Sequence, residues 1–305
     1  IFVGVFYNKM SQFFIKNFYK QRADFAKEAA ARDKALSFPE GVIEQKDIRY
    51  LDDRIEAHRL DIFRPANRDG DILPVIVNVH GGGLLLGSKE FNRFFCARLS
   101  ALGFLVYSIE YRLIPDCEFY EQLSDFSDAM NYIKDRIVSD HGDPSRVYAV
   151  GDSGGACLLV YGTAAGNCPA VAKAAHITPS ALKFRALGLI SGMFYTTRFD
   201  KIGLFLPRYL YGKHYKKRAF APYTNPDHAD IAGSLPPCFL ITSCKDHLRH
   251  YTIDFEKALT RCHTPHELLD FPDDPRLTHA FCVFEPFMEE STDAITSMTQ
   301  FLLKY

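Results

Sequence analysis

The sequence lacks the spacings that mark disulfide frameworks and zinc sites. Its eight cysteines form no Cys-x-x-Cys pair, and residues such as Cys157 and Cys238 lie inside apolar runs, where buried thiols are common. The pairs His247-x-x-His250 and His263-x-x-His266 have neither the His-Glu-x-x-His arrangement nor companion cysteine ligands. We therefore expect a reducing compartment, the cytoplasm, with no disulfides and no metal.

Net charge and long apolar runs are also nearly absent. Lys and Arg number 36 against 37 Asp and Glu, so the net charge is −1 and gives no bulk attraction to nucleic acid. The apolar run 1–7 is interrupted at Asn8 and Lys9, too early for a membrane span, so we expect no stable membrane insertion. A small neutral substrate is the expected partner, and assembly as a homodimer stays open, as does an upstream leader.

The 305 residues, 47% of them hydrophobic, suffice for one large domain with an appended lid or for two small domains. Strand-like stretches (73–79, 104–111, 147–150, 186–191, 237–243 and 267–271) alternate with helix-like stretches (92–102, 119–139, 251–261 and 285–303). This alternation predicts an α/β fold with a mostly parallel sheet and right-handed crossovers. Two earlier alternating segments, 42–50 and 58–64, predict an antiparallel pair at the sheet edge.

The stretch 146–156, RVYAVGDSGGA, is typical of a nucleophile elbow. A β-branched and aromatic run leads into Ser153, which is flanked by Gly151 and Gly155, and a helix-compatible run follows. A turn that lifts a serine out of a sheet brings neighbouring backbone very close, so residues without a bulky Cβ are needed on both sides. The pentapeptide alone is a weak signal, but its strand-turn-helix context favours Ser153 as a nucleophile.

A second glycine motif, His80-Gly81-Gly82-Gly83, follows a buried strand. Its glycines allow backbone N–H groups to approach a substrate oxygen, so we expect Gly82 and Gly83 to donate to an oxyanion, with the Gly154 amide as the third donor. The alternative is a turn that only packs tightly. His80 precedes the serine in the chain and is expected to be a structural residue.

Acyl transfer by a serine needs a base and a carboxylate that orients it, in the chain order Ser, acid, His. Asp246 follows the strand 237–243, whereas Asp254 falls in a predicted helix and Asp273 or Asp274 would at best substitute. His279 stands in the loop after the last strand and is the expected base. The rival histidines are too early for that loop: His247, His250, His263 and His266.

Two segments that lie outside the alternation of strands and helices are expected to form a cap. Residues 2 to about 36 carry aromatics spaced for one helix face (Phe6, Met10, Phe13, Phe14, Phe18 and Phe25), which predicts an amphipathic helix. The tract 194–234 is rich in Tyr, Phe, Pro, Lys and Arg without a clean period, which indicates an insertion. Its apolar residues either line a substrate pocket or attach the lid to the body. The expected pocket residues are Leu84, Phe205, Leu206 and Tyr209.

These motifs resemble those of the hormone-sensitive-lipase-like family of α/β-hydrolase esterases. The resemblance covers roughly residue 60 to the C-terminus and rests on elements in family order: His80-Gly81-Gly82-Gly83 with Gly87, Tyr111-Arg112-Leu113 with Pro115, Asp143-Pro144-Ser145-Arg146, Gly151-Asp152-Ser153, Asp246-x-Leu248-Arg249 and His279-x-Phe281. It implies a twisted eight-stranded sheet flanked by helices, with cap helices in 1–40, a cap insertion in 194–235 and a catalytic domain in 41–193 and 236–305. The chain departs from the family at Gly154, where Ala is usual, and at His247, where Pro is usual.

The resemblance implies a serine carboxylesterase without a cofactor that acts on short- to medium-chain acyl esters, acetyl esters included, through a Ser153, His279 and Asp246 triad and an acyl-enzyme. Activity is then expected to be lost as the pH drops below about 6 to 7, the range in which an ordinary imidazole becomes protonated. Two alternatives stay open: a ligand-binding homologue without chemistry, and hydrolysis of lactones or amides.

Overall fold

The computed structural model describes the backbone of residues 2–68 and 70–305 and, within these ranges, the side chains from Ile15 onward. Its centre is an eight-stranded sheet in the order β1-β2-β4-β3-β5-β6-β7-β8. The strands are β1 (Val42–Arg49), β2 (Arg59–Pro65), β3 (Leu73–Val79), β4 (Leu105–Ile109), β5 (Gly142–Asp152), β6 (Leu187–Ile190), β7 (Cys238–Ser243) and β8 (His266–Phe271). β2 is antiparallel to β1 and β4, and all other pairs are parallel. The predicted mostly parallel sheet with an antiparallel edge is confirmed.

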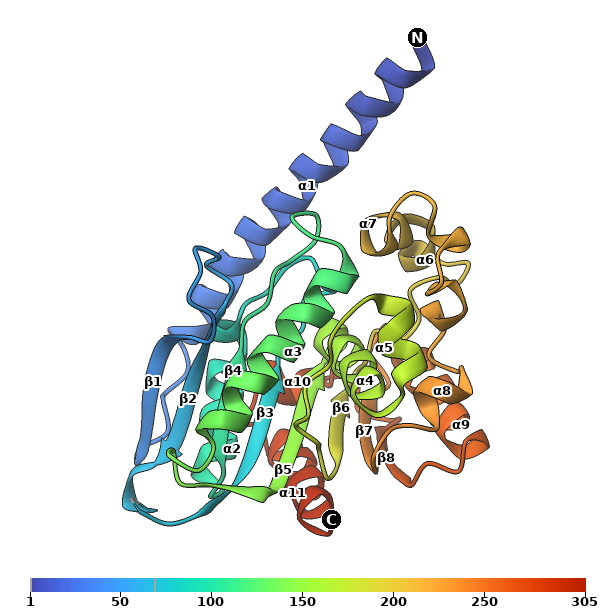
Figure 1. Ribbon diagram of the computed structural model, residues 1–305. Coiled ribbons are helices and arrows are strands. Elements are labelled where there is room, and N and C mark those ends of the chain that lie inside the picture. The colour runs from blue at the N-terminus through green and yellow to red at the C-terminus, as the bar shows by residue number, and fades with distance from the viewer. Residues whose placement is uncertain (1, 69) are drawn as a thin grey trace.

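Helices cover both faces of the sheet (Figure 1). One face packs against α3 (Phe119–Arg136), α4 (Ser153–Asn167), α5 (Pro169–Ala175) and α9 (Arg249–Arg261), the other against α2 (Arg93–Ala101), α10 (Phe281–Phe284) and α11 (Glu289–Leu303). The alternation of β3 shows why: Val75, Val77 and Val79 enter the first core cluster, and Ile76 enters the second. A central strand that is buried on both faces therefore reads as a continuous apolar run.

The C-terminal helix differs from its predicted extent. Residues 285–303 were expected to be helical, whereas α10 ends at Phe284 and α11 begins at Glu289. Pro286 explains the break, because proline has no N–H to donate to a helix and disfavours helical dihedrals in the residue before it.

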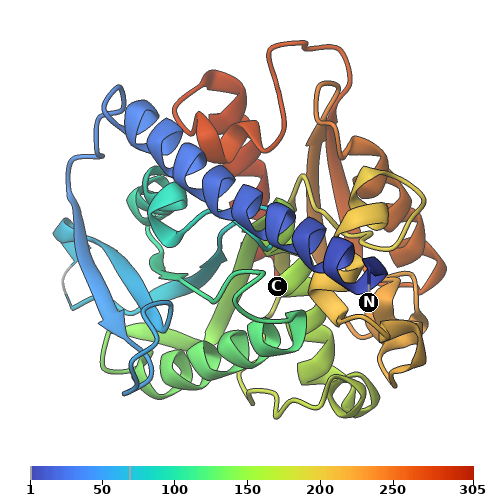
Figure 2. The same ribbon diagram turned by 90° about the horizontal axis from the view of Figure 1, so that it is seen from above.

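Parts of the two segments predicted to form the cap lie over the same end of the molecule (Figure 1). α1 (Phe2–Asp33) is one continuous helix that crosses the body when seen from above (Figure 2). Residues 194–235 contain α6 (Lys201–Phe205), α7 (Pro207–Tyr211), α8 (Ala229–Ala232) and two 3-10 turns, η3 (Tyr215–Lys217) and η4 (Ala221–Thr224). Phe18 on α1 meets the ring of Tyr209 edge to face, with centroids 5.2 Å apart. The side chains of Phe6, Met10, Phe13 and Phe14 lie outside the described residues.

Among the described helices, none is by itself both long and apolar enough to cross a membrane. The sharply bent pair α4 and α5 meets the length and composition criteria only when its two helices are taken together.

Candidate active site

The elbow forms where β5 passes directly into α4. Ser153 is the first residue of α4 and has a φ of +50°, a left-handed conformation that costs a non-glycine residue on the order of 1–3 kcal/mol. A Cβ at Gly155 would lie 2.2 Å from the carbonyl oxygen of Val79 and 2.4 Å from that of His80. Only glycine fits there, so the sequence itself imposes the close packing that raises Ser153 above the end of the sheet.

Asp246 and His279 come from two turns that the sheet places side by side. They follow β7 and β8, and the residues just before them, Lys245 and Thr278, form a parallel bridge. Nδ1 of His279 lies 2.6 Å from Oδ1 of Asp246. This contact is the geometry expected of a carboxylate that orients an imidazole.

The environment of Asp246 keeps it ionised. Its side chain is fully buried, and its carboxylate also accepts hydrogen bonds from the N–H of Leu248 at 2.8 Å and the hydroxyl of Thr242 at 2.8 Å. Burial by itself raises the pKa, but the hydrogen bond and charge of His279, together with these two donors, outweigh it. The pKa of Asp246 therefore lies below its ordinary value.

Ser153 and His279 face one cavity of about 410 Å³. Its described lining residues are Phe18, Gln21, Phe25, Gly82, Gly83, Leu85, Leu86, Asp152, Ser153, Met193, Lys201, Ile202, Phe205, Leu206, His247, Leu248, His279 and Phe284. No hydrogen bond joins Ser153 to His279, both of which are described residues. Such bonds are often formed only once substrate is bound.

The His-Gly-Gly-Gly segment forms a turn next to the elbow. Gly82 and Gly83 have φ values of +108° and +62°, and the next residue, Leu84, has +68°. The backbone nitrogens of Gly83 and Leu84 lie only 2.8 and 2.6 Å from where a Cβ of Gly154 would be. The turn is thus packed directly on the N-terminus of α4, with Gly82 and Gly83 on the cavity wall.

Buried polar side chains fix this turn, and three of them had no predicted role: Asp152, Asn92 and Glu110. Oδ1 of Asp152 accepts from the N–H of Gly81 at 2.9 Å and from the Asn92 amide at 2.8 Å. Nε2 of His80 lies 2.8 Å from Oε1 of Glu110, so His80 is a fully buried structural residue. Asp152 stands in the elbow motif, but Asn92 and Glu110 carry no local signal, because the buried side chains that they contact lie 14 to 60 residues away in the sequence.

The four expected pocket residues separate into two groups. Phe205 and Leu206 line the cavity. Leu84 does not: it is fully buried in the core, and Leu85 and Leu86 occupy the wall instead, because the left-handed turn directs the Leu84 side chain away from the opening. Tyr209 is likewise absent from the wall and packs against Phe18 of α1.

His247 contributes a second imidazole to the cavity wall. Its ring centroid lies 4.4 Å from that of His279, and burial, followed by the nearby charge of His279, lowers the pKa of His247. Within the described residues, Asp246, His247 and His279 each offer a potential metal ligand atom within 4.8 Å of one another. Two of these atoms, Nδ1 of His279 and Oδ1 of Asp246, are the pair that lies 2.6 Å apart.

Comparison with known proteins fits this geometry. A family model described as alpha/beta hydrolase fold matches residues 76–283, which is more than half of the chain. The chain belongs to this family. The resemblance to the hormone-sensitive-lipase-like esterases is consistent with that result, and the eight-stranded sheet is the one this α/β-hydrolase fold requires.

Individual relatives of this α/β-hydrolase are esterases. Carboxylesterase NlhH of Mycobacterium tuberculosis is 28% identical over 286 residues, which cover 89% of this chain and 87% of that protein. A probable isoprenylcysteine alpha-carbonyl methylesterase of Oryza sativa is 35% identical over 108 residues, but the match spans only 34% of this chain and 25% of the plant protein. The chain thus spans about a quarter of the length of the plant methylesterases that it matches.

Solved structures give the same fold. Esterase B from Lactobacillus rhamnosis aligns with a TM-score of 0.88 at 21% identity, covering 94% of this chain and 93% of that one. A hyperthermophilic esterase from Pyrobaculum calidifontis aligns with a TM-score of 0.71 at 24% identity, covering 93% and 92%. At these identities the likeness concerns the fold.

Proposed function

We propose that this α/β-hydrolase is a serine carboxylesterase that hydrolyses short- to medium-chain acyl esters, acetyl esters included. The observation that carries the proposal is the 2.6 Å contact of Asp246 with His279, which lines the same cavity as Ser153. A buried carboxylate that orients an imidazole beside a strained serine is an arrangement suited to acyl transfer.

In this mechanism His279 takes the hydroxyl proton of Ser153 as its Oγ attacks the ester carbonyl. Asp246 holds the Nδ1 proton and stabilises the imidazolium that forms. The amides of Gly82, Gly83 and Gly154 donate to the oxyanion of the tetrahedral intermediate. His279 then gives its proton to the departing alcohol, and water, deprotonated by the same imidazole, releases the acid from Ser153.

The cavity supports acyl esters as the substrate class. Its volume of about 410 Å³ is ample for a short or medium acyl chain, and its described wall is mostly apolar. Asp152 and Lys201 are the formally charged side chains other than histidine among the described lining residues, and Asp152 is 1% exposed. The environment thus favours uncharged acyl groups.

Hydrolysis of p-nitrophenyl esters from acetate to decanoate tests the proposal. We expect turnover that peaks at short or medium chains, stoichiometric labelling of Ser153 by an organophosphate, and loss of both in Ser153→Ala. Full turnover by Ser153→Ala would refute the mechanism. Matched ester and amide substrates separate esterase from amidase activity, and ligand binding without a burst of acylation would favour a non-catalytic role.

A further inference from the structure

Arg22 on α1 joins the lid helix to two loops of the body. Its Nε donates to the carbonyl oxygen of Leu85 at 2.7 Å, and one terminal nitrogen donates to the carbonyl oxygen of Ile114. The other terminal nitrogen pairs with the carboxylate of Asp116 at 2.6 Å, and Tyr19, one turn earlier on α1, donates to the same carboxylate. The planar guanidinium therefore satisfies three acceptors at once, which suits its rigid fork of donors.

One of these acceptors belongs to the turn that carries the expected oxyanion donors. The amides of Leu85 and Leu86 both donate to the carbonyl of Gly82, at 3.2 and 2.9 Å, and so close the turn around Gly83 and Leu84. The positive φ of Leu84 is an unfavourable conformation for a leucine and persists only where surrounding contacts hold it. Arg22 supplies such a contact, at the residue next to Leu84.

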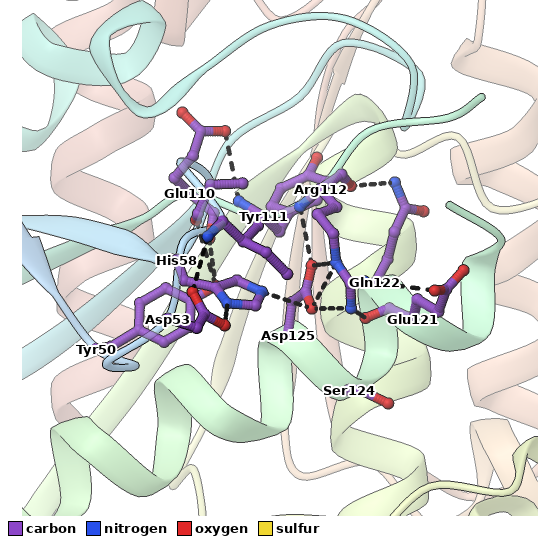
Figure 3. A network of polar contacts seen from close by, with 12 residues as sticks. Tyr50, Asp53, His58, Glu110, Tyr111, Arg112, Glu121, Gln122, Ser124 and Asp125 are labelled. Carbon is purple, nitrogen blue, oxygen red and sulfur yellow. Dashed lines mark hydrogen bonds and ion pairs between the residues drawn. The ribbon is translucent and has the colours of Figure 1, made fainter. Parts of the chain in front are cut away.

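The second loop held by Arg22 supports the same turn from the other side. The carbonyl of Leu84 accepts from the N–H of Ile114 at 3.0 Å and from the side-chain amide of Gln122 at 2.9 Å. This loop is itself fixed to α3, since Arg112 pairs with the buried Asp125 at 2.6 Å, and the Gln122 amide also reaches the Arg112 backbone (Figure 3). Arg22 thus closes a ring of hydrogen bonds that runs from the lid through both loops.

We propose that Arg22 is a positioning residue that makes the geometry of the turn at residues 82–86, the oxyanion turn, depend on docking of α1. The inference rests on the proposed esterase function and deepens it. The same helix lines the cavity through Phe18, Gln21 and Phe25, so its docking both covers the substrate and sets the amides of Gly82 and Gly83. An undocked α1 leaves the serine accessible and the oxyanion donors unsupported.

A purely structural role for Arg22 predicts a different result. If the residue only attaches α1 to the body, its loss weakens the cover over the substrate and raises KM. If it also positions the turn, its loss lowers kcat, because oxyanion donors act mainly on the transition state. The division of the effect between kcat and KM therefore separates the two roles.

Arg32 offers a matched control on the same helix. Its guanidinium donates to the carbonyl of Phe91 at 2.8 Å and stacks on the Phe91 ring, so it also attaches α1 to the body. None of its contacts within the described residues reaches the turn at 82–86. Arg22→Ala and Arg32→Ala each remove one arginine that attaches α1 to the body. A difference between their kcat values therefore reports on the turn at 82–86.

The experiment measures kcat and KM for p-nitrophenyl butyrate in the wild type, Arg22→Ala, Arg22→Lys and Arg32→Ala, with Ser153→Ala as the baseline. We expect kcat to fall about tenfold or more in Arg22→Ala, with less than about a threefold change in KM, and to stay within about twofold in Arg32→Ala. Millimolar guanidinium chloride should restore part of the kcat of Arg22→Ala, whereas equal potassium chloride should not. Arg22→Lys, which keeps the charge but not the fork, should give an intermediate kcat.

Wild-type kcat in Arg22→Ala, or an equal loss of kcat in Arg32→Ala, would overturn the positioning role. If Arg22→Ala does not fold in a thermal melt, Arg22→Lys decides, and a wild-type kcat there refutes the requirement for the guanidinium. Failure of the esterase proposal is seen separately, as wild-type activity no greater than that of Ser153→Ala.

Discussion

Gly154→Ala tests whether the oxyanion turn is packed as tightly as the structure shows. A Cβ at this position would lie 2.6 Å from the Leu84 nitrogen, 2.8 Å from the Gly83 nitrogen and 2.9 Å from the Gly83 Cα. All three are backbone atoms, so no side-chain rotation relieves the contact. Restoring an ordinary separation of about 3.4 Å requires the turn to move by about 0.8 Å.

A shift of that size separates the donors from the position of the oxyanion. Misplacement of about 1 Å costs up to about 100-fold in rate, so we expect kcat to fall about 10- to 100-fold, equivalent to about 1.4–2.7 kcal/mol of transition-state stabilisation. KM should change little, because the donors act after attack on the carbonyl. Steady-state kinetics on p-nitrophenyl butyrate measures both values.

Gly166→Ala is the control on the same helix. Its Cβ would meet the Ser180 carbonyl at 3.8 Å and Lys183 Nζ at 3.9 Å, which are ordinary contacts. Both substitutions gain up to about 1 kcal/mol of helix propensity, but only Gly154→Ala presses on the turn. A kcat for Gly154→Ala within twofold of the wild type, with Gly166→Ala behaving normally, would refute the reasoning. It would mean that the turn yields without loss of function.

Three further changes probe other parts of the structure. Asp246→Asn should lower kcat by about 10⁴-fold, because an amide in place of the carboxylate favours the wrong tautomer of His279. The pKa of Asp246 is depressed in the folded state, so its carboxylate contributes stability above about pH 4 and loses that contribution as the pH falls through the folded pKa. The free energies of unfolding of wild type and mutant in urea should therefore become equal in acid. Lys89→Met should cost about 3–5 kcal/mol in urea unfolding, since it leaves the fully buried Asp61 without its cation 2.9 Å away; a loss below 1 kcal/mol would contradict this. Gly162→Ala should lower the melting temperature, because its Cβ would lie 2.5 Å from the buried Phe126 ring and overpacking costs about 1–3 kcal/mol; an unchanged melt would show that the ring moves freely.

Local sequence patterns were enough to predict the sheet, its antiparallel edge and the elbow. β3 is one run of buried residues, and the elbow turn is formed by five consecutive residues, Gly151-Asp152-Ser153-Gly154-Gly155. Patterns of this kind report short-range sterics and periodic burial, which act between neighbours in the chain. The break at Pro286 was also readable from one residue, but the periodic apolar positions on both sides masked it.

The cavity wall was less predictable. Leu84 was expected to line the pocket because it follows the glycine motif, yet the left-handed turn places it in the core and brings Leu85 and Leu86 to the opening. Side-chain direction at that point depends on three successive positive φ values, which no hydrophobicity pattern encodes. The contribution of α1 to the cavity wall was likewise not predictable, because it depends on how the whole helix packs across the cavity.

Strand, turn and helix signals are local, so they were enough to indicate candidates for acyl transfer and the order in which these residues occur: Ser153, Asp246 and His279. Tertiary structure alone decided that Lys245 and Thr278 pair, which brings Asp246 within 2.6 Å of His279, and that Arg22 reaches a turn more than 60 residues further along the chain. Contacts over such separations depend on how whole elements pack. Their free energy is shared among many residues, so no short stretch of sequence carries it.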